Sequence, residues 1–150
     1  MSVITTAEGP RSSRRSGGQG RLQNHEERTA IEKHAEKVTV EMLKAEGWQT
    51  ELKGKPYDIR CTRDKEVLIV EVKGTTSKGT DVVLTKNEVK IQRESFPNNA
   101  LAVVSEIELD RSGPKPSASG GKIKFIHPWR IELHDLKTLT YQYKVPANQT

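Results

Sequence analysis

The chain has 150 residues, a formal net charge of +5 and a single cysteine, Cys61. This length suits one domain with its own core, and a single cysteine excludes an internal disulfide. No apolar run approaches the roughly 20 residues of a membrane span, and the N-terminus lacks the apolar centre of a signal peptide. We therefore expect a cytoplasmic protein without membrane contact, whose mild basic excess permits binding to nucleic acid without requiring it.

The first 22 residues are expected to be a disordered basic arm, followed by a single domain over residues 23–150. The stretch RSSRRSGGQGR contains no acidic residue and four arginines, Arg11, Arg14, Arg15 and Arg21. Such an arm could follow the phosphates of a nucleic acid and add salt-dependent affinity without sequence preference. The alternative is a solvated tail that makes no contacts.

A charged amphipathic helix is predicted over residues 26–46. One apolar stripe at helical spacing comprises Ile31, Ala35, Val38, Met42 and Ala45. Gly47 is a typical residue for the end of such a helix. Glu32 lies about 100° around the helix from Ile31, which places it at the edge of the stripe.

Three strands are expected in the next part of the chain. Residues 48–52 can form a short strand, residues 57–62 a second, and residues 66–73 a third that is rich in valine, leucine and isoleucine. The tight charged turn Arg63-Asp64-Lys65 separates the last two, which predicts a hairpin.

A second helix is predicted after a polar loop and a brief strand over residues 81–84. Thr85 is a good N-terminal cap, and Glu88 three residues later completes a capping box. This helix should end near Phe96-Pro97.

The last third of the chain contains a second buried-looking strand, ALAVVSEIEL, over residues 100–109. A loop rich in Pro, Gly and Ser is expected over residues 110–122, and KIKFIHPWRIEL then predicts another strand and a short helical turn. The segment YQYKVP could be a closing edge strand or an ordered tail. The whole order favours an α/β (α+β) fold in which helices flank a mixed sheet.

The third strand ends in charged residues. Because side chains alternate along a strand, Glu71 and Lys73 share one face with Val67 and Ile69. The strand could simply emerge into water there, with both charges solvated. Asp58 on the partner strand and Glu32 on the first helix could instead converge with Glu71 beside Lys73, and Gly74 would allow another backbone to approach closely. Carboxylates grouped in this way favour a hard divalent cation.

These pieces resemble a known superfamily. Glu32 in IEKHA, Asp58 in PYDIR and Glu71-Val72-Lys73 in IVEVKGT look like the PD-(D/E)XK nucleases, although Tyr57 stands where the proline of that name would be. The longer string, with VLTKNE after it, resembles the family of the Protein NO VEIN C-terminal domain over about residues 26–108. The resemblance implies a restriction-endonuclease-like fold.

The resemblance also implies a chemistry. Asp58 and Glu71 would hold Mg²⁺ or Mn²⁺ with the carbonyl of Val72, and Lys73 would orient or help to deprotonate the attacking water. Glu32 would complete the surroundings of the metal or bind a second ion. The expected activity is hydrolysis of phosphodiester bonds in DNA, or in RNA, as part of restriction, defence or repair. A homodimer is expected by analogy, because nucleases of this size often use two subunits to cut both strands.

Two alternatives remain open from the sequence. Thr85, Asn87 and Glu88 resemble a T-x-N-E element of the relatives, which could be a capping box alone or could border the site, where a helix N-terminus can receive a phosphate. The whole domain could also be a catalytically inactive nucleic-acid-binding or protein-interaction module with the same fold.

Overall fold

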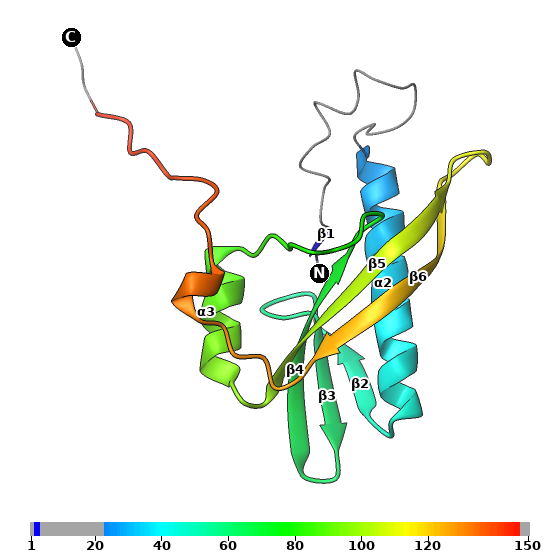
Figure 1. The fold of residues 1–150 in the computed structure, drawn as a ribbon, viewed down its shortest axis with the longest axis horizontal. Helices are drawn as coiled ribbons and strands as arrows, with labels where there is room; N and C mark the ends of the chain where they lie inside the picture. Colours follow the sequence, from blue (N-terminus) through cyan, green and yellow to red (C-terminus); the bar gives the residue numbers. More distant parts are fainter. Residues whose placement is uncertain (1, 4–22, 148–150) are drawn as a thin grey trace.

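A mixed β-sheet forms the centre of the fold in the computed structural model, which describes residues 2–3 and 23–147 (Figure 1). Its strands are β1 (Ser2–Val3), β2 (Gln49–Leu52), β3 (Ile59–Arg63), β4 (Glu66–Gly74), β5 (Asn99–Asp110) and β6 (Ser117–Ile126). The spatial order is β2-β3-β4-β5-β6, and β1 pairs with the end of β4. The β1–β4 and β4–β5 pairs are parallel and the others antiparallel.

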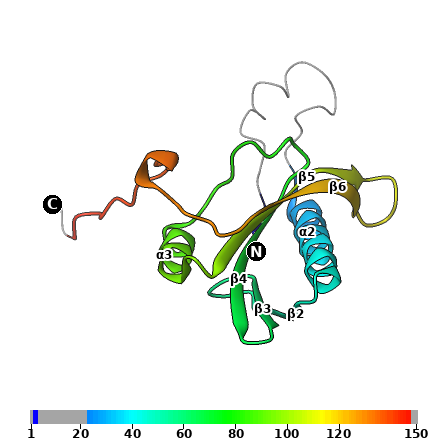
Figure 2. The same cartoon turned by 60° about the horizontal axis from the view of Figure 1, so that its bottom comes forward.

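Two helices cover opposite faces of this sheet, α2 (His25–Ala45) and α3 (Lys86–Ser95) (Figure 2). The α2-side core joins Ile31, Ala35 and Leu43 of α2 to Ile59, Cys61, Leu68, Val70, Val72, Ala100, Ala102 and Val104 of the sheet, among others. The α3-side core contains Leu101, Val103, Trp129 and Ile131, with Val82, Leu84, Val89 and Ile126 packed around them. The expected α+β fold with a flanked mixed sheet is confirmed. No helix in the described part of the chain is long and apolar enough to cross a membrane.

The predicted first helix is confirmed, but its buried stripe differs from the expected one. The buried residues recur every four positions: Glu27, Ile31, Ala35, Thr39 and Leu43. Val38 and Met42 are only half-buried and Ala45 is exposed. Thr39 is tolerated in the core because its hydroxyl donates to the carbonyl of Ala35 at 2.8 Å. The helix ends before Gly47, whose φ of +92° is typical of glycine at this position.

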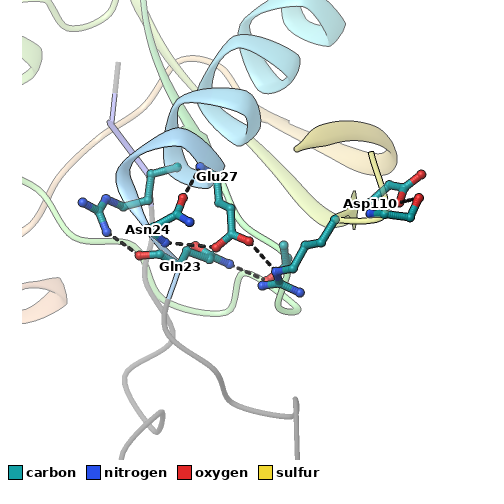
Figure 3. Close-up of polar contacts among 8 residues, drawn as sticks. Gln23, Asn24, Glu27 and Asp110 are labelled. Atoms are coloured by element: carbon teal, nitrogen blue, oxygen red, sulfur yellow. Dashed lines mark hydrogen bonds and ion pairs between the residues drawn. The ribbon is translucent and has the colours of Figure 1, made fainter. Parts of the chain in front are cut away.

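The start of α2 is held by a polar cluster that joins three parts of the chain (Figure 3). The Asn24 side chain accepts from the Glu27 N–H at 2.8 Å, and Glu27 Oε1 accepts from the Asn24 N–H at 3.0 Å, which completes a capping box. Glu27 Oε2 pairs with Arg111, which follows β5. Gln23 donates to Thr76 in the loop after β4. This cluster fixes the start of α2 to the segments that follow β4 and β5.

The predicted β3–β4 hairpin is confirmed. Its turn is Asp64-Lys65, and Asp64 adopts a positive φ of 53°, as two-residue hairpin turns require. β4 ends beside α2, where a Cβ on Gly74 would lie 2.7 Å from the Ala35 Cβ and 3.2 Å from the Ile31 carbonyl oxygen. The close backbone approach expected at this glycine is therefore confirmed.

Two expectations for the loops are wrong. Residues 81–84 form no strand, because Val82 and Leu84 pack into the α3-side core while the backbone stays unpaired with the sheet. The loop expected over residues 110–122 is shorter, since β6 begins at Ser117, opposite Asp110. The long β5 supplies backbone partners to a Gly- and Ser-rich strand that its composition does not favour. Of the two alternatives for residues 141–146, the edge strand is not formed, and the expected short helical turn is η1 (Leu133–Asp135).

The four arginines of the expected arm, Arg11, Arg14, Arg15 and Arg21, lie outside the described residues. Only Ser2–Val3 of that arm are described, and they pair with Lys73–Gly74 of β4.

Candidate functional site

The candidate site lies where β3 and β4 separate. The β3–β4 ladder ends at the Ile59–Val70 pair, but β4 continues to Gly74 beside β5. Asp58 immediately precedes β3, and its Oδ2 accepts from the backbone N–H of Val72 at 2.7 Å. A side-chain carboxylate therefore takes the place of a ladder carbonyl. This hydrogen bond holds Asp58 against the short backbone segment that carries Glu71 and Lys73.

Glu71 and Lys73 are buried on the α3 side of the sheet. Asp58, Glu71 and Lys73 are each only 1% exposed, so the interpretation of a strand emerging into water is wrong. Lys73 Nζ lies 3.6 Å from Glu71 Oε2 and 3.0 Å from Glu88 Oε1. Buried charges are costly unless paired, and this arrangement pairs one ammonium with two carboxylates.

The start of α3 borders this cluster directly. Glu88 Oε1 accepts from the Thr85 N–H at 3.0 Å, and Thr85 Oγ1 accepts from the Glu88 N–H at 3.1 Å. The same Oε1 receives the Lys73 ammonium. Glu88 therefore completes the capping box of α3 and also contacts Lys73 in the candidate site. Asn87 is exposed in the first turn of the helix.

The electrostatics of the two glutamates differ. Burial raises the pKa of Glu71 to about 7, and the adjacent Glu88 carboxylate adds to the rise, although the Lys73 ammonium opposes it. Burial would also raise the pKa of Glu88, but the Thr85 N–H and the Lys73 ammonium outweigh it and lower that pKa below its usual 4.5. Near neutral pH, Glu71 is therefore the carboxyl that exchanges a proton, while Glu88 stays ionised beside Lys73.

Glu32 lies apart from this cluster. It is half-buried on α2, and α2 packs on the sheet face formed by Val70 and Val72, opposite to the face that carries Glu71. Over residues 23–147, no three His, Cys, Asp or Glu side chains are grouped closely enough to hold a metal ion. The structure thus brings together Asp58, the Val72 backbone, Glu71 and Lys73, but not Glu32, whose role stays a prediction.

Gln92 of α3 was missed by the reading of the sequence. It lies one turn after Glu88 on the same face of the helix and is fully buried. Neither atom of its side-chain amide has a hydrogen-bond partner within the described part of the chain. A buried amide in this state costs free energy, and only one helical turn separates Gln92 from Glu88. The spacing of four residues from Glu88 is the sequence signal that could have indicated it.

Of the comparisons with known proteins, the one with protein families gives a match. Neither the curated proteins nor the solved structures include a match to this chain. A family model described as Protein NO VEIN, C-terminal, matches residues 26–117, which is more than half of the chain. The matched segment includes α2, Asp58, the end of β4 and the capped start of α3. The chain therefore belongs to the family of the Protein NO VEIN C-terminal domain.

Proposed function

We propose that this protein is a metal-dependent nuclease of the PD-(D/E)XK type that hydrolyses phosphodiester bonds in DNA. The observation that supports this most is the buried group of Asp58, Glu71 and Lys73 at the point where β3 leaves β4. An aspartate before one strand and a Glu-x-Lys at the end of the next have the order of that superfamily, on a mixed sheet flanked by helices. The same pattern favours a role in restriction, defence or repair.

The residues fit a hard divalent cation. Asp58 and Glu71 offer carboxylate oxygens, and Glu71 Oε2 is buried 3.6 Å from the Lys73 ammonium. Two carboxylates are enough for Mg²⁺ or Mn²⁺, because Mg²⁺ usually keeps several waters and is bound by one or two carboxylates plus substrate phosphates. Such an ion would supply positive charge next to the phosphate and lower the pKa of a bound water.

Lys73 is the residue of the chain best placed to act on the reacting atoms. Its ammonium is a point charge with three donors, held between Glu71 and Glu88 at the end of a rigid strand. In the proposed reaction it would orient the attacking water and donate to a phosphate oxygen as negative charge develops there. Glu88 would hold this ammonium in place until substrate arrives.

The alternative of an inactive module also has an observation in its favour. Lys73 is already paired with Glu88 at 3.0 Å and is 1% exposed, so the cluster is closed in this conformation. A closed ion-pair network is also how a purely structural group of buried charges would look. In that case the domain would bind nucleic acid or protein with the same fold, without cutting.

Cleavage of supercoiled plasmid separates the two functions. The purified full chain with Mg²⁺ or Mn²⁺ should nick or linearise DNA, and EDTA or Lys73→Met should abolish this. Lys65→Met, which removes an exposed lysine from the β3–β4 turn, is the matched control and should cut normally. Folded protein that binds DNA equally with and without metal, and cuts neither DNA nor an RNA of the same length, would establish the inactive module instead.

A further inference from the structure

Residues 138–145 carry an apolar pattern that the described monomer does not use. The sequence TLTYQYKV alternates polar and apolar residues, so an extended chain presents Leu139, Tyr141, Tyr143 and Val145 on one side. These four side chains are 65%, 91%, 76% and 74% exposed. Such strict alternation over eight residues is typical of a half-buried strand, yet this segment pairs with no described strand.

The path of the chain keeps this segment away from its own sheet. Trp129 and Ile131 are buried in the α3-side core and anchor the chain there. After η1, the chain leaves the body on the α3 side as an extended segment and points away from β6 (Figures 1 and 2).

The sheet has a matching unpaired edge. β6 ends the strand order, so one edge of its ten residues has no neighbour among the described strands. Ile123 and Phe125 of β6 lie on the α2 side of the sheet, opposite Val104 and Ala102, and are only partly buried. A strand added beside β6 with its apolar side on this face would cover them and continue the α2-side core. β2, at the other end of the order, has only four residues.

We propose that residues 138–145 add as a strand to the outer edge of β6 in a second copy of the chain, with reciprocal exchange between the two copies. The chain itself supplies both the unpaired edge and an unpaired segment of similar length. Reciprocal exchange closes as a twofold dimer, as most homo-oligomers do. A ribbon made only of two tails would be marginal in water, which favours addition to an existing sheet.

The proposed exchange would bury an area of the size found in stable dimers. A buried tyrosine contributes about 150–250 Å², and the exchange buries Tyr141 and Tyr143 twice. With Leu139, Val145 and the paired backbone, the interface reaches the range of roughly 1,200–2,000 Å² found in specific complexes. Tyrosines at the centre of such an interface are typical hot-spot residues.

Light scattering coupled to size-exclusion chromatography tests this proposal over a dilution series. The full chain should have twice its monomer mass of 16.8 kDa. Tyr141→Glu with Tyr143→Glu should weaken the dimer by at least about tenfold, because both anchors of the apolar side are lost. Thr140→Glu with Gln142→Glu adds the same charge on the polar side and should leave the dimer intact. A full chain that stays monomeric, or equal loss in both double variants, would overturn the proposal.

Disulfide trapping identifies the edge that receives the segment. In the added strand, Gln142 lies on the same side of the sheet as Lys124 of β6, so a mixture of Gln142→Cys and Lys124→Cys chains should form a covalent heterodimer on oxidation. Gln49→Cys places the thiol on β2 as the matched control and should not be trapped. Trapping to β2, or only between two Gln142→Cys tails, would contradict addition to β6. The native Cys61 is buried and should not compete.

Discussion

Both helices begin with the same local motif, but the two copies of it hold different partners. In α2, Asn24 and Glu27 form the capping box, and in α3, Thr85 and Glu88 form it. In each case the glutamate also binds a cation from outside its own helix. Glu27 binds Arg111 and Glu88 binds Lys73.

The two cations make the difference between the copies. Arg111 is 36% exposed at its side chain and uses the second oxygen of Glu27, so this cluster joins α2 to the hairpin formed by β5 and β6. Lys73 is buried and shares one oxygen of Glu88 with the Thr85 N–H, while Glu71 lies at its other side. A helix cap is thus a structural device in one place and part of a candidate reaction site in the other.

Removing Lys73 or Arg111 should give the largest difference between the two clusters, because only Lys73 belongs to the candidate reaction site. Lys73→Met should slow single-turnover DNA cleavage by at least about 100-fold, since loss of one donor to a developing oxyanion costs about 10²–10³ in rate. Arg111→Met should leave the cleavage rate unchanged at a temperature where the variant is folded, as judged by circular dichroism. Equal losses of rate in the two variants would remove the distinction between the clusters.

The Glu27–Arg111 ion pair should instead affect the free energy of unfolding. Arg111→Met removes the Arg111 ion pair from the buried Glu27 carboxylate, which should lower the free energy of unfolding by about 2 kcal/mol, less than for a fully buried pair. Urea denaturation measures this change. Lys115→Met, in the same hairpin but exposed, is the control and should change stability by no more than about 0.5 kcal/mol. If Arg111→Met leaves the free energy of unfolding unchanged, the Glu27–Arg111 contact does not stabilise the fold.

The pH dependence of stability should report the Glu71 side of the second cluster. The pKa of Glu71 is about 7 in the folded state against 4.5 ordinarily, so the folded state binds the proton more tightly. Its stabilising contribution is present below about pH 4.5 and is lost as the pH rises through 7. Between pH 5 and 7.5, stability of the wild type should therefore fall relative to Glu71→Gln, on the order of 2 kcal/mol.

Glu88 does not interfere with this measurement. Its pKa is lowered, so its contribution is lost only as the pH falls below about 4.5, outside the window. Urea denaturation of both proteins at the two pH values gives the difference directly. Parallel profiles for wild type and Glu71→Gln would show that Glu71 is not perturbed by its burial.

The caps themselves should give the smallest effects. Asn24→Ala and Thr85→Ala each remove one side-chain acceptor from a helix start and should cost about 1 kcal/mol in unfolding free energy. Thr85→Ala should also alter cleavage, because it loosens the residue that holds Lys73, whereas Asn24→Ala should not. An equal cleavage defect in Asn24→Ala would contradict a special role of the α3 cap in cleavage.

Local patterns were sufficient for most of the fold. The 3.6-residue periodicity and Gly47 located α2, the Thr85–Glu88 capping box located α3, and the apolar run before Glu71 located β4. β6 was only partly located, because Gly120 and Gly121 have low strand propensity and are held in the sheet by pairing with β5. Val82 and Leu84 resembled a strand, but side-chain packing rather than backbone pairing accounts for their apolar character.

Only part of the membership of the candidate site, and little of its arrangement, was predictable from the sequence. The order Asp58, Glu71, Lys73 follows from adjacent strands, and the hairpin brings them together. The contact of Glu88 with Lys73 depends on how α3 returns to the sheet, which no short pattern specifies. Glu32 illustrates the reverse case, since its position at the edge of a helix stripe did not reveal which face of the sheet the helix covers.

Binding of Mn²⁺ in the absence of DNA tests the central proposal most directly. Electron paramagnetic resonance of free Mn²⁺ during titration counts bound ions without relying on turnover. At pH 8, where Glu71 is ionised, the wild type should bind Mn²⁺ with a clear saturation point. Glu71→Gln and Asp58→Asn should bind at least about tenfold more weakly, while Glu32→Gln shows whether α2 contributes. Equal binding by the wild type and by a folded Asp58→Asn, Glu71→Gln double variant would contradict a metal site at the end of β4.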